Sequence, residues 1–446
     1  MNTSRNEYIA RLTGNDFIDI DLYNKFNVKR GLRNADGTGV LVGLTRIGDV
    51  HGYIIDEGEP MPVEGKLYYR GIDLEEIVRI AALEKRFAFE ETVYLLMFGE
   101  LPSKDQLDEF SALIGNSRSL PKNFFEDSIV KFPARDLMNK LARSVLTLYS
   151  YDEAPENLSP ENVLRQSLEL IARFPTMVAY SYMAKKHYFD HDSLVIHMPD
   201  PAASTAETFL SLIRPDRQYT RLEAELLDLA LVLHAEHGGG NNSTFAVHLV
   251  SSADTDTFSA IAAGIESLKG FRHGGANIKV MEMMEDIKNN VKNWEDEGEV
   301  ADYLTSILKG EAYDGTGLIY GQGHAVYTIT DPRALLLRDK AASLAEDRDL
   351  VDEFNLYRLI EKLTPVVFKK YKGSGKAICT NVDFYSGFVY KMLGIPKDLY
   401  TPLFAISRVS GWCAHRMEEI ISGGKIIRPA YKCVQSRLSY TPIDNR

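Results

Sequence analysis

Helical hydrophobic spacing runs through most of this chain, and strand signals are confined to a short stretch near its start. From Asp73 onward, apolar residues recur every three or four positions, as at Leu74, Ile77 and Val78, which is the spacing of an amphipathic helix. Helix ends are expected at Gly99 and Gly310, and helix starts at Ser103 and at Asp331, which precedes a proline. Strand-like segments (GVLVGLTRI, HGYII and GKLYY) occur only within residues 38–72, separated by Gly, Asp and Pro. Because so few strands cannot build a large sheet, the sequence predicts a mainly α fold with a small N-terminal β region.

Length and composition argue against several classes of protein. At 446 residues the chain is long enough for two or three domains. A formal net charge of -12 argues against a general nucleic-acid surface. No apolar run approaches the ~18 residues of a membrane span, and the N-terminus lacks the apolar stretch of a signal peptide. The three cysteines, Cys379, Cys413 and Cys433, form no CxxC pair and suit a reducing compartment. We expect a cytoplasmic protein that binds neither nucleic acid nor membrane.

Four of the ten histidines lie between residues 234 and 277, beside two clusters of glycine. A helical stripe of leucines predicts a helix that ends at His237, where one glycine cluster begins, and the other cluster directly follows His273. Glycines next to an imidazole leave open backbone and room for a ligand. Two later stretches look like partners of this one: GQGH, which ends at His324, and NVD, which ends at Asp383. We expect these ionisable groups to belong to one site.

Three other interpretations compete for these residues. A metal could be chelated by His234 and His237, which are three residues apart, but no carboxylate or cysteine stands at a recognised metal spacing and HExxH is absent. The sequence therefore favours no metal site. A serine hydrolase is disfavoured because G-x-S-x-G does not occur. Hydrogen-bonded core histidines are the expected interpretation for His234 and His248; glycines beside His273 and His324 disfavour it there.

Several stretches around these residues resemble the signature stretches of one known family. LHAEHGGGN, GFRHGGAN, GQGHAVYTITDPRA, NVDFYSG and FAISRVSGW are similar, in the same order, to segments of citrate synthases, and GKLYYRGIDLEEI and ETVYLLMFGELPS resemble the family's N-terminal half. The resemblance covers about residues 28 to 430. It implies a helical fold of two domains, with residues 1–275 and 385–446 in a large domain and residues 276–384 in a small one.

The resemblance also implies a catalytic role for three positions. Asp383 matches the base that removes a methyl proton from acetyl-CoA, and His273 matches the group that hydrogen-bonds the thioester oxygen as the enolate forms. His324 matches the group that polarises the ketone of oxaloacetate. Citryl-CoA is then hydrolysed to citrate and CoA. Since we expect His273 to stand at the positive end of a helix, its imidazole should stay neutral and donate a hydrogen bond.

Further positions match groups that bind substrates in the family. The family's residues that hold the oxaloacetate carboxylates match three positions here: His237, Arg333 and Arg408. Arginine suits a dicarboxylate because its planar fork pairs with carboxylate oxygens. In the homodimer that the family forms, Arg428 matches an arginine that reaches the citrate site of the other subunit. Arg30 and Lys376 are matches for CoA phosphate contacts. Acetyl-CoA enters as a cosubstrate, and the resemblance implies no permanently bound cofactor.

Two departures from the family pattern lie on the CoA side. Thr328 stands where many relatives have a basic residue, and Thr380 stands where many have proline. The acyl donor is therefore open: the alternative to citrate synthase is 2-methylcitrate synthase, which uses propionyl-CoA. A second alternative is a non-catalytic homologue that binds CoA or a dicarboxylate. That alternative predicts the loss of a catalytic residue, and the three catalytic positions are all retained.

Overall fold

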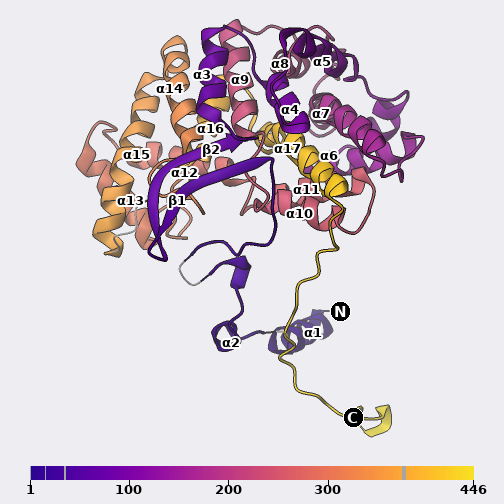
Figure 1. Ribbon diagram of the computed structural model, residues 1–446. Helices are drawn as coiled ribbons and strands as arrows, with labels where there is room; N and C mark the ends of the chain where they lie inside the picture. Colours follow the sequence, from indigo (N-terminus) through magenta and orange to yellow (C-terminus); the bar gives the residue numbers. More distant parts are fainter. Residues whose placement is uncertain (1, 16, 35–36, 374–377, 446) are drawn as a thin grey trace.

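The computed structural model describes residues 2–15, 17–34, 37–373 and 378–445. Helix accounts for 59% of the chain and strand for 6%, which confirms the predicted mainly α class. Most helices gather in one body, and the two ends of the chain extend away from it on the same side (Figure 1). None of the described helices combines the length and apolarity that a membrane span requires.

The helices fall into two series, before and after the turn that carries His273. Those before it are α1 (Asn2–Asn15), α2 (Asp21–Lys25), α3 (Leu74–Leu83), α4 (Phe89–Phe98), α5 (Lys104–Asn116), α6 (Leu137–Leu148), α7 (Pro160–Phe189), α8 (Thr205–Ile213), α9 (Arg221–His234), α10 (Asn242–Ser251) and α11 (Thr257–Lys269). Those after it are α12 (Ala276–Asn290), α13 (Glu297–Lys309), α14 (Pro332–Asp347), α15 (Val351–Lys372), α16 (Val382–Met392) and α17 (Tyr400–Ser422). Short 3-10 or π segments are η1 (Arg30–Leu32), η2 (Phe125–Val130), η3 (Tyr149–Tyr151), η4 (Lys397–Leu399) and η5 (Ile443–Asn445).

Several helices begin and end where the sequence predicts a boundary. Ser103 and Gln106 form a reciprocal capping box at the start of α5, and Asp331 caps α14 just before a proline. Gly99 and Gly310 follow α4 and α13 in the left-handed conformation, which suits a residue without a Cβ atom. These boundaries are confirmed.

The small sheet consists of three antiparallel strands in the order β1 (Gly48–Asp56), β2 (Glu59–Tyr69) and β3 (Ile72–Asp73). Two of the three predicted strand segments lie in it, but a strand over residues 39–47 is wrong. Within that stretch only Gly39 forms a bridge, with Arg33. Its leucines are 85% and 92% exposed. Backbone hydrogen bonds join the stretch to Leu32 at Val40 and to Arg70 at Ile47, but these two bonds form no ladder among the described residues. Apolar residues alone do not make a strand.

Two glycines let the sheet lie directly against the segment that follows His324. A Cβ atom at Gly52 would lie 2.8 Å from the carbonyl oxygen of Val326, and one at Gly65 would collide with the carbonyl oxygen of Thr330. The Gly65 N–H also donates to the Thr330 hydroxyl at 3.0 Å. The sheet thus supports the loop that presents His324, which explains why a small β region persists in a helical protein.

Helix α17 forms the centre of the body. It packs against α4, α7, α9, α10 and α11, and every residue from 400 to 417 is buried. Most of these residues are apolar, as expected of a helix enclosed on all sides. The same helix also carries Arg408, His415 and Arg416 into the interior, and these charged or titratable groups need partners there.

The helices from α12 to α16 lie together on one side of the body (Figure 1), with contacts that join α12 and α14 to α16, and α13 to α15. They span the stretch that the sequence assigns to the small domain, although residue 384 falls inside α16 rather than between helices. The domain boundaries at 276 and 384 stay a prediction.

Candidate active site

Backbone pairing brings the GQGH loop and the NVD stretch together. Gln322 and Thr380 form an isolated antiparallel bridge, and the Asn381 side chain donates to the Gly323 carbonyl at 2.8 Å. Asn381 also caps α16 by accepting from the backbone N–H of Asp383 at 3.0 Å. These bonds hold His324 and Asp383, which are distant in the sequence, on neighbouring segments. Two of the expected catalytic residues therefore share one rigid support.

His324 is held as a neutral hydrogen-bond donor. Its Nδ1 accepts backbone N–H bonds from Val326 and Tyr327, both at 3.1 Å, so the proton of the neutral ring is on Nε2. That Nε2 lies 3.1 Å from Nε2 of His237. Burial, with a further contribution from Arg333, lowers the pKa of His324 to about 4, and the ring stacks on Tyr327. The geometry thus leaves one donor, which points toward His237.

His237 lies beyond the end of α9, because the helix ends at His234, three residues before the predicted end at His237. A continuing helix would use the His234 carbonyl to accept the Gly238 N–H. The Arg408 Nε donates to that carbonyl instead, at 2.6 Å, and the Gly238 N–H donates to the Glu236 carboxylate. Burial, followed by nearby cations, lowers the pKa of His237 well below its ordinary value. The ring is therefore neutral, and its Nε2 faces the Nε2–H of His324.

Arg408 carries an unpaired buried charge. The side chain is fully buried, and apart from its Nε, neither of the terminal nitrogens Nη1 and Nη2 has a hydrogen-bond partner among the described residues. Burial lowers the pKa of Arg408 to about 10, and Phe404 lies under the guanidinium at 4.7 Å. Since burying a charge without partners is costly, these two nitrogens indicate a place for an anion.

Arg333, in contrast, already has a carboxylate partner. Its Nε and Nη2 donate to the two oxygens of Asp331 at 3.0 and 2.7 Å. Burial lowers the pKa of Arg333, but the Asp331 carboxylate more than offsets this, so that the pKa is raised. The sequence identified Asp331 only as a helix cap and missed this pairing. Only Nη1 of Arg333 remains outside the pair.

His273 stands in the turn just before α12, as predicted. Its Nε2 lies 3.1 Å from Oδ1 of Asn241 and 3.0 Å from the hydroxyl of Ser243. The Ser243 hydroxyl in turn accepts the indole N–H of Trp412 at 3.2 Å. Burial, followed by the charge of Arg408, lowers the pKa of His273 to about 4. The imidazole is neutral, and its Nε2 is occupied by protein groups.

Asp383 lies in the first turn of α16, close enough to Arg333, Asp331 and Arg408 to respond to their charges. Burial raises the pKa of its carboxyl to about 6, and Arg333 opposes this rise. A carboxylate with a raised pKa is a stronger base than one in water. The site thus combines a buried base, neutral imidazoles and a free guanidinium, a combination that suits proton abstraction next to an anionic substrate.

A protein-family comparison identifies the family. The matching family model is described as citrate synthase, C-terminal domain, and it covers residues 35–430. The chain belongs to the citrate synthase family.

Individual relatives agree with this membership over nearly their whole length. A citrate synthase of Haloferax volcanii is 33% identical over 94% of this chain and 99% of its own. A 2-methylcitrate synthase of Shewanella oneidensis is 31% identical over 85% of this chain and 92% of its own. Among solved structures, a ternary complex of carboxymethyl coenzyme A and oxaloacetate with the citrate synthase of Thermoplasma acidophilum has a TM-score of 0.76 and 25% identity, covering 94% of this chain and 99% of that one. Membership identifies an enzyme that transfers an acyl group.

Two of the expected binding residues, Arg428 and Arg30, are not brought to this site. Arg428 is exposed on the C-terminal segment beyond α17, which extends from the body (Figure 1). Arg30 is exposed on the N-terminal arm and lies over the ring of Tyr23. Lys376 lies outside the described residues. The nearby Arg33, which the sequence did not select, does reach the site's edge, where its Nη1 donates to the Ala325 carbonyl at 3.4 Å.

The expectation of a hydrogen-bonded core histidine holds for only one of the two residues, His234 and His248. His248 bonds to His415 and Glu419, which confirms the expected hydrogen-bonded histidine. For His234 that expectation is wrong, because neither ring nitrogen has a hydrogen-bond partner in the described part of the chain. Its ring instead packs on Phe404, and burial lowers its pKa well below the ordinary value.

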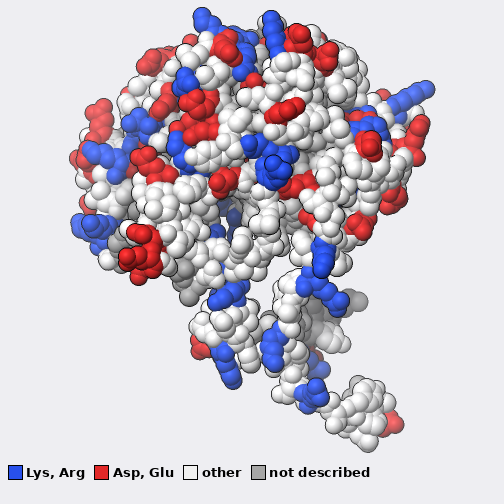
Figure 2. Space-filling view, viewed as in Figure 1, with Lys and Arg blue, Asp and Glu red and all other residues white. Residues whose placement is uncertain are grey.

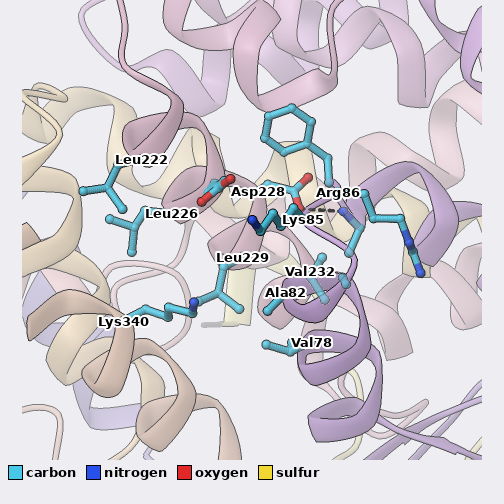
Figure 3. Close-up of a pocket in the computed structure, with 14 residues that line it drawn as sticks. Val78, Ala82, Lys85, Arg86, Leu222, Leu226, Asp228, Leu229, Val232 and Lys340 are labelled. Carbon is cyan, nitrogen blue, oxygen red and sulfur yellow. Dashed lines mark hydrogen bonds between the residues drawn. The ribbon is translucent and has the colours of Figure 1, made fainter. Parts of the chain in front are cut away.

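A cavity away from these residues has a structural explanation. It lies between α3 and α9, with Lys340 of α14 at its rim (Figure 3). The buried carboxyl on its wall, Asp228, accepts the backbone N–H groups of Ala88 and Phe89 at 2.7 and 3.2 Å. Asp228 therefore caps the start of α4 from a neighbouring helix, and its position needs no ligand to explain it.

Proposed function

We propose that this chain condenses acetyl-CoA with oxaloacetate and, with water, yields citrate and CoA, so that the acyl group becomes an alkyl group on transfer. The observation that carries the proposal is the guanidinium of Arg408, whose terminal nitrogens have no partner among the described residues. Its charge acts on the buried base Asp383 and on the neutral ring of His273, and it also acts on His237, which contacts the neutral ring of His324. Family membership supports the same reaction.

Proton abstraction is the first chemical step of the proposal. Asp383 removes a methyl proton of acetyl-CoA, and its raised pKa favours the transfer. His273 donates to the thioester oxygen as negative charge develops there, and one such donor stabilises a transition state by about 3 kcal/mol. Since the Nε2 of His273 is occupied, the donor is Nδ1–H. In the structure the Ser243 hydroxyl accepts the indole N–H of Trp412 and donates to Oδ1 of Asn241 at 2.8 Å. For this tautomer the hydroxyl would turn to donate to Nε2, and Oδ1 of Asn241, which only accepts, would move away from Nε2.

Oxaloacetate polarisation is the second step. The Nε2–H of His324, which bonds to His237 in the unliganded site, turns to the ketone oxygen, and the enol carbon attacks the ketone. His237, Arg408 and Nη1 of Arg333 hold the substrate carboxylates. Because two nitrogens of Arg408 have no partner among the described residues, they can donate to the two oxygens of one carboxylate in the bidentate geometry that arginine favours. Hydrolysis of citryl-CoA then releases the products.

Domain closure is part of the proposal. Residues 276–384, the small domain, would close on the large domain formed by residues 1–275 and 385–446. Figure 2 shows the body hollowed between its two sides, with basic side chains inside the hollow. Closing this hollow would exclude water before enolisation. We expect oxaloacetate to bind first, and tight acetyl-CoA binding to the free enzyme in calorimetry would contradict that order.

A homodimer is the proposed assembly, with Arg428 reaching the partner's citrate site. The dimer is supported by the two terminal segments, which extend away from the body and carry large exposed apolar side chains that a second subunit could cover. Among them are Tyr8, Phe17, Ile426, Tyr431 and Leu438. Lys432 of one arm lies over Phe26 of the other, so the arms of one chain meet and form a surface for a second. Arg30 and Lys376 would then contact the CoA phosphates, in a cytoplasmic enzyme of the tricarboxylic acid cycle.

The experiment follows thiol release from acetyl-CoA and from propionyl-CoA, each with and without oxaloacetate. Release from acetyl-CoA that requires oxaloacetate and exceeds release from propionyl-CoA in kcat/KM supports citrate synthase. A preference for propionyl-CoA would instead identify a 2-methylcitrate synthase, which is the name of the Shewanella relative. No release from either thioester, by folded protein, would favour the non-catalytic homologue.

A further inference from the structure

A second histidine pair lies on the other side of the glycine cluster from the substrate groups. His248 of α10 and His415 of α17 approach each other with Nε2 of the first 3.0 Å from Nδ1 of the second. The outer nitrogen of each ring meets a carboxylate. His415 Nε2 lies 2.9 Å from Glu236, and His248 Nδ1 lies 3.0 Å from Glu419. The four groups form one chain of contacts inside the protein.

In this row of four groups, no hydrogen is available for a bond between the two imidazole rings. A carboxylate only accepts, so each neutral ring carries its proton on the outer nitrogen. The two nitrogens that face each other at 3.0 Å are then both acceptors, and two lone pairs at this distance repel. The hydroxyl of Thr45, at 3.5 Å from Nδ1 of His415, is too far for a strong bond. A positive charge between the rings would remove the repulsion.

Glu418 supplies a third group at the same place. Its Oε1 is fixed by the backbone N–H of Arg46 at 2.7 Å. Its Oε2 is buried, has no hydrogen-bond partner among the residues that the structure describes, and lies 3.8 Å from Nδ1 of His415. The three ligand atoms of His248, His415 and Glu418 lie within 4.8 Å of one another. In the part of the chain that the structure describes, no lysine or arginine pairs with any of the three glutamates 236, 418 and 419.

Gly239 leaves space beside the pair. A Cβ atom at this position would lie 3.6 Å from Nε2 of His248 and from Cε1 of His415, so any larger residue would fill the open side of the two rings. At the next residue, Gly240, a Cβ atom would meet no atom of the described residues within 4 Å. The glycine cluster after His237 thus borders two histidine pairs, of which the proposed reaction uses only one.

We propose that His248, His415 and Glu418 bind a divalent metal ion of the zinc class. Two imidazole nitrogens and one carboxylate oxygen are a known zinc ligand set, and tetrahedral bonds of ~2.0 Å place ligand atoms ~3.3 Å apart. The two distances from Nδ1 of His415, 3.0 and 3.8 Å, lie on either side of this value, and the third pair lies within 4.8 Å. Carboxylates on the outer nitrogens of both rings are the usual support of metal-bound histidines. Water completes the coordination. The sequence favoured no metal site because these residues lie far apart along the chain.

The ion would stabilise the fold rather than react. It would join α10 to α17 and to residues 45–46, and it would fix Glu236 through His415. Glu236 in turn accepts the N–H of Gly238, next to His237. The metal would therefore hold the loop that presents His237, and its binding does not depend on which reaction the enzyme catalyses.

The test uses the full chain, stripped with a chelator and titrated with zinc, with thermal unfolding and the visible spectrum of the cobalt(II) form as readouts. His248→Asn keeps a donor near Glu419 but removes the ligand nitrogen, and Glu418→Gln changes one ligand oxygen conservatively. His191→Asn is the matched control, because His191 is exposed and adopts a positive φ that asparagine tolerates.

We expect wild type and His191→Asn to bind stoichiometric zinc, to gain about 3 °C in Tm at 100-fold excess over Kd, and to give tetrahedral cobalt bands. Both ligand variants should lose the binding and the gain. Absence of zinc binding by the wild type would overturn the proposal and leave a shared proton between the rings. Zinc binding of wild-type affinity in folded Glu418→Gln and His248→Asn would overturn it as well, because the ion would then sit elsewhere.

Discussion

Replacing Arg408 by methionine should remove substrate binding while leaving the fold about as stable as before. At pH 7 the side chain is charged, and burial lowers its pKa from 12.5 to about 10, which corresponds to a folding penalty of about 3 kcal/mol. The substitution removes that penalty. It also removes the bond from Nε to the His234 carbonyl, which stabilises by ~1.5–3 kcal/mol. Methionine has a similar shape, and its sulfur can pack on Phe404.

The two effects nearly cancel, so the free energy of unfolding of Arg408→Met should stay within about 1 kcal/mol of wild type. Substrate binding should not survive. Two charge-assisted hydrogen bonds to a carboxylate are worth ~3–6 kcal/mol together, so KM for oxaloacetate should rise at least ~100-fold. Urea unfolding measures the first quantity, and thiol release at increasing oxaloacetate measures the second.

Arg416 on the same helix is the matched control. It is equally buried, and burial lowers its pKa to about 10 as well. Its three nitrogens, however, donate to Thr257, Ser251 and the Thr255 carbonyl at 3.1, 3.0 and 2.7 Å. Arg416→Met leaves these acceptors unpaired and should destabilise the protein by about 3 kcal/mol. If Arg408→Met is as destabilising as Arg416→Met and KM is unchanged, Arg408 is a structural residue and the reasoning fails.

Other consequences follow from the pKa shifts and from the contacts of His273. Because burial raises the pKa of Asp383 to about 6, kcat/KM should fall as the pH drops below about 6; a profile that is flat to pH 5 would count against Asp383 as the base. Burial lowers the pKa of His273 and His324 from 6.5 to about 4, so the unfolded chain takes up protons that the folded chain refuses. The contribution of these two histidines to stability is therefore present above pH 6.5 and is lost as the pH falls toward 4. Asp383 opposes this effect, because its raised pKa lowers the stability of the fold as the pH rises from 3.8 to 6. Urea unfolding midpoints measured at a series of pH values would show the net loss of stability on acidification. Ser243→Ala should lower kcat ~10-fold or more with little change in KM for oxaloacetate, since the hydroxyl bonds to His273, Asn241 and Trp412 and to none of the groups assigned to oxaloacetate. An equal rise in KM would indicate a general distortion instead.

Local sequence signals predicted what local chemistry determines. Gly99, Ser103 and Asp331 bound helices where expected, because capping depends on residues within one turn. The helix before His237 ended early, because its last carbonyl is taken by Arg408, 174 positions away in the sequence. The strand expected over residues 39–47 failed for a similar reason, since a strand needs a partner that its own sequence does not specify.

The sequence predicted which residues belong to the candidate site, but not their protonation or their ion pairs. The motifs identified His273, His324 and Asp383, and the structure supplies what the motifs lack: the tautomer of His324, the pairing of Arg333 with Asp331 and the free nitrogens of Arg408. The first two are contacts between residues two or three positions apart, but they depend on a loop conformation and a side-chain rotamer that the motifs do not specify. The free nitrogens of Arg408 depend on tertiary packing, which joins its Nε to the distant His234 carbonyl. The pair of His248 and His415, 167 positions apart, lies beyond any spacing rule for metal ligands.

Thiol release by Asp383→Asn would decide whether this carboxylate is the base of an acetyl-CoA condensation. The substitution keeps the size of the side chain and removes its basicity. With oxaloacetate binding unchanged in calorimetry, we predict that release from acetyl-CoA falls by ~10²- to 10⁴-fold relative to wild type. Release at the wild-type rate, from a variant that still requires oxaloacetate, would contradict the assignment of Asp383 and require another base in the site.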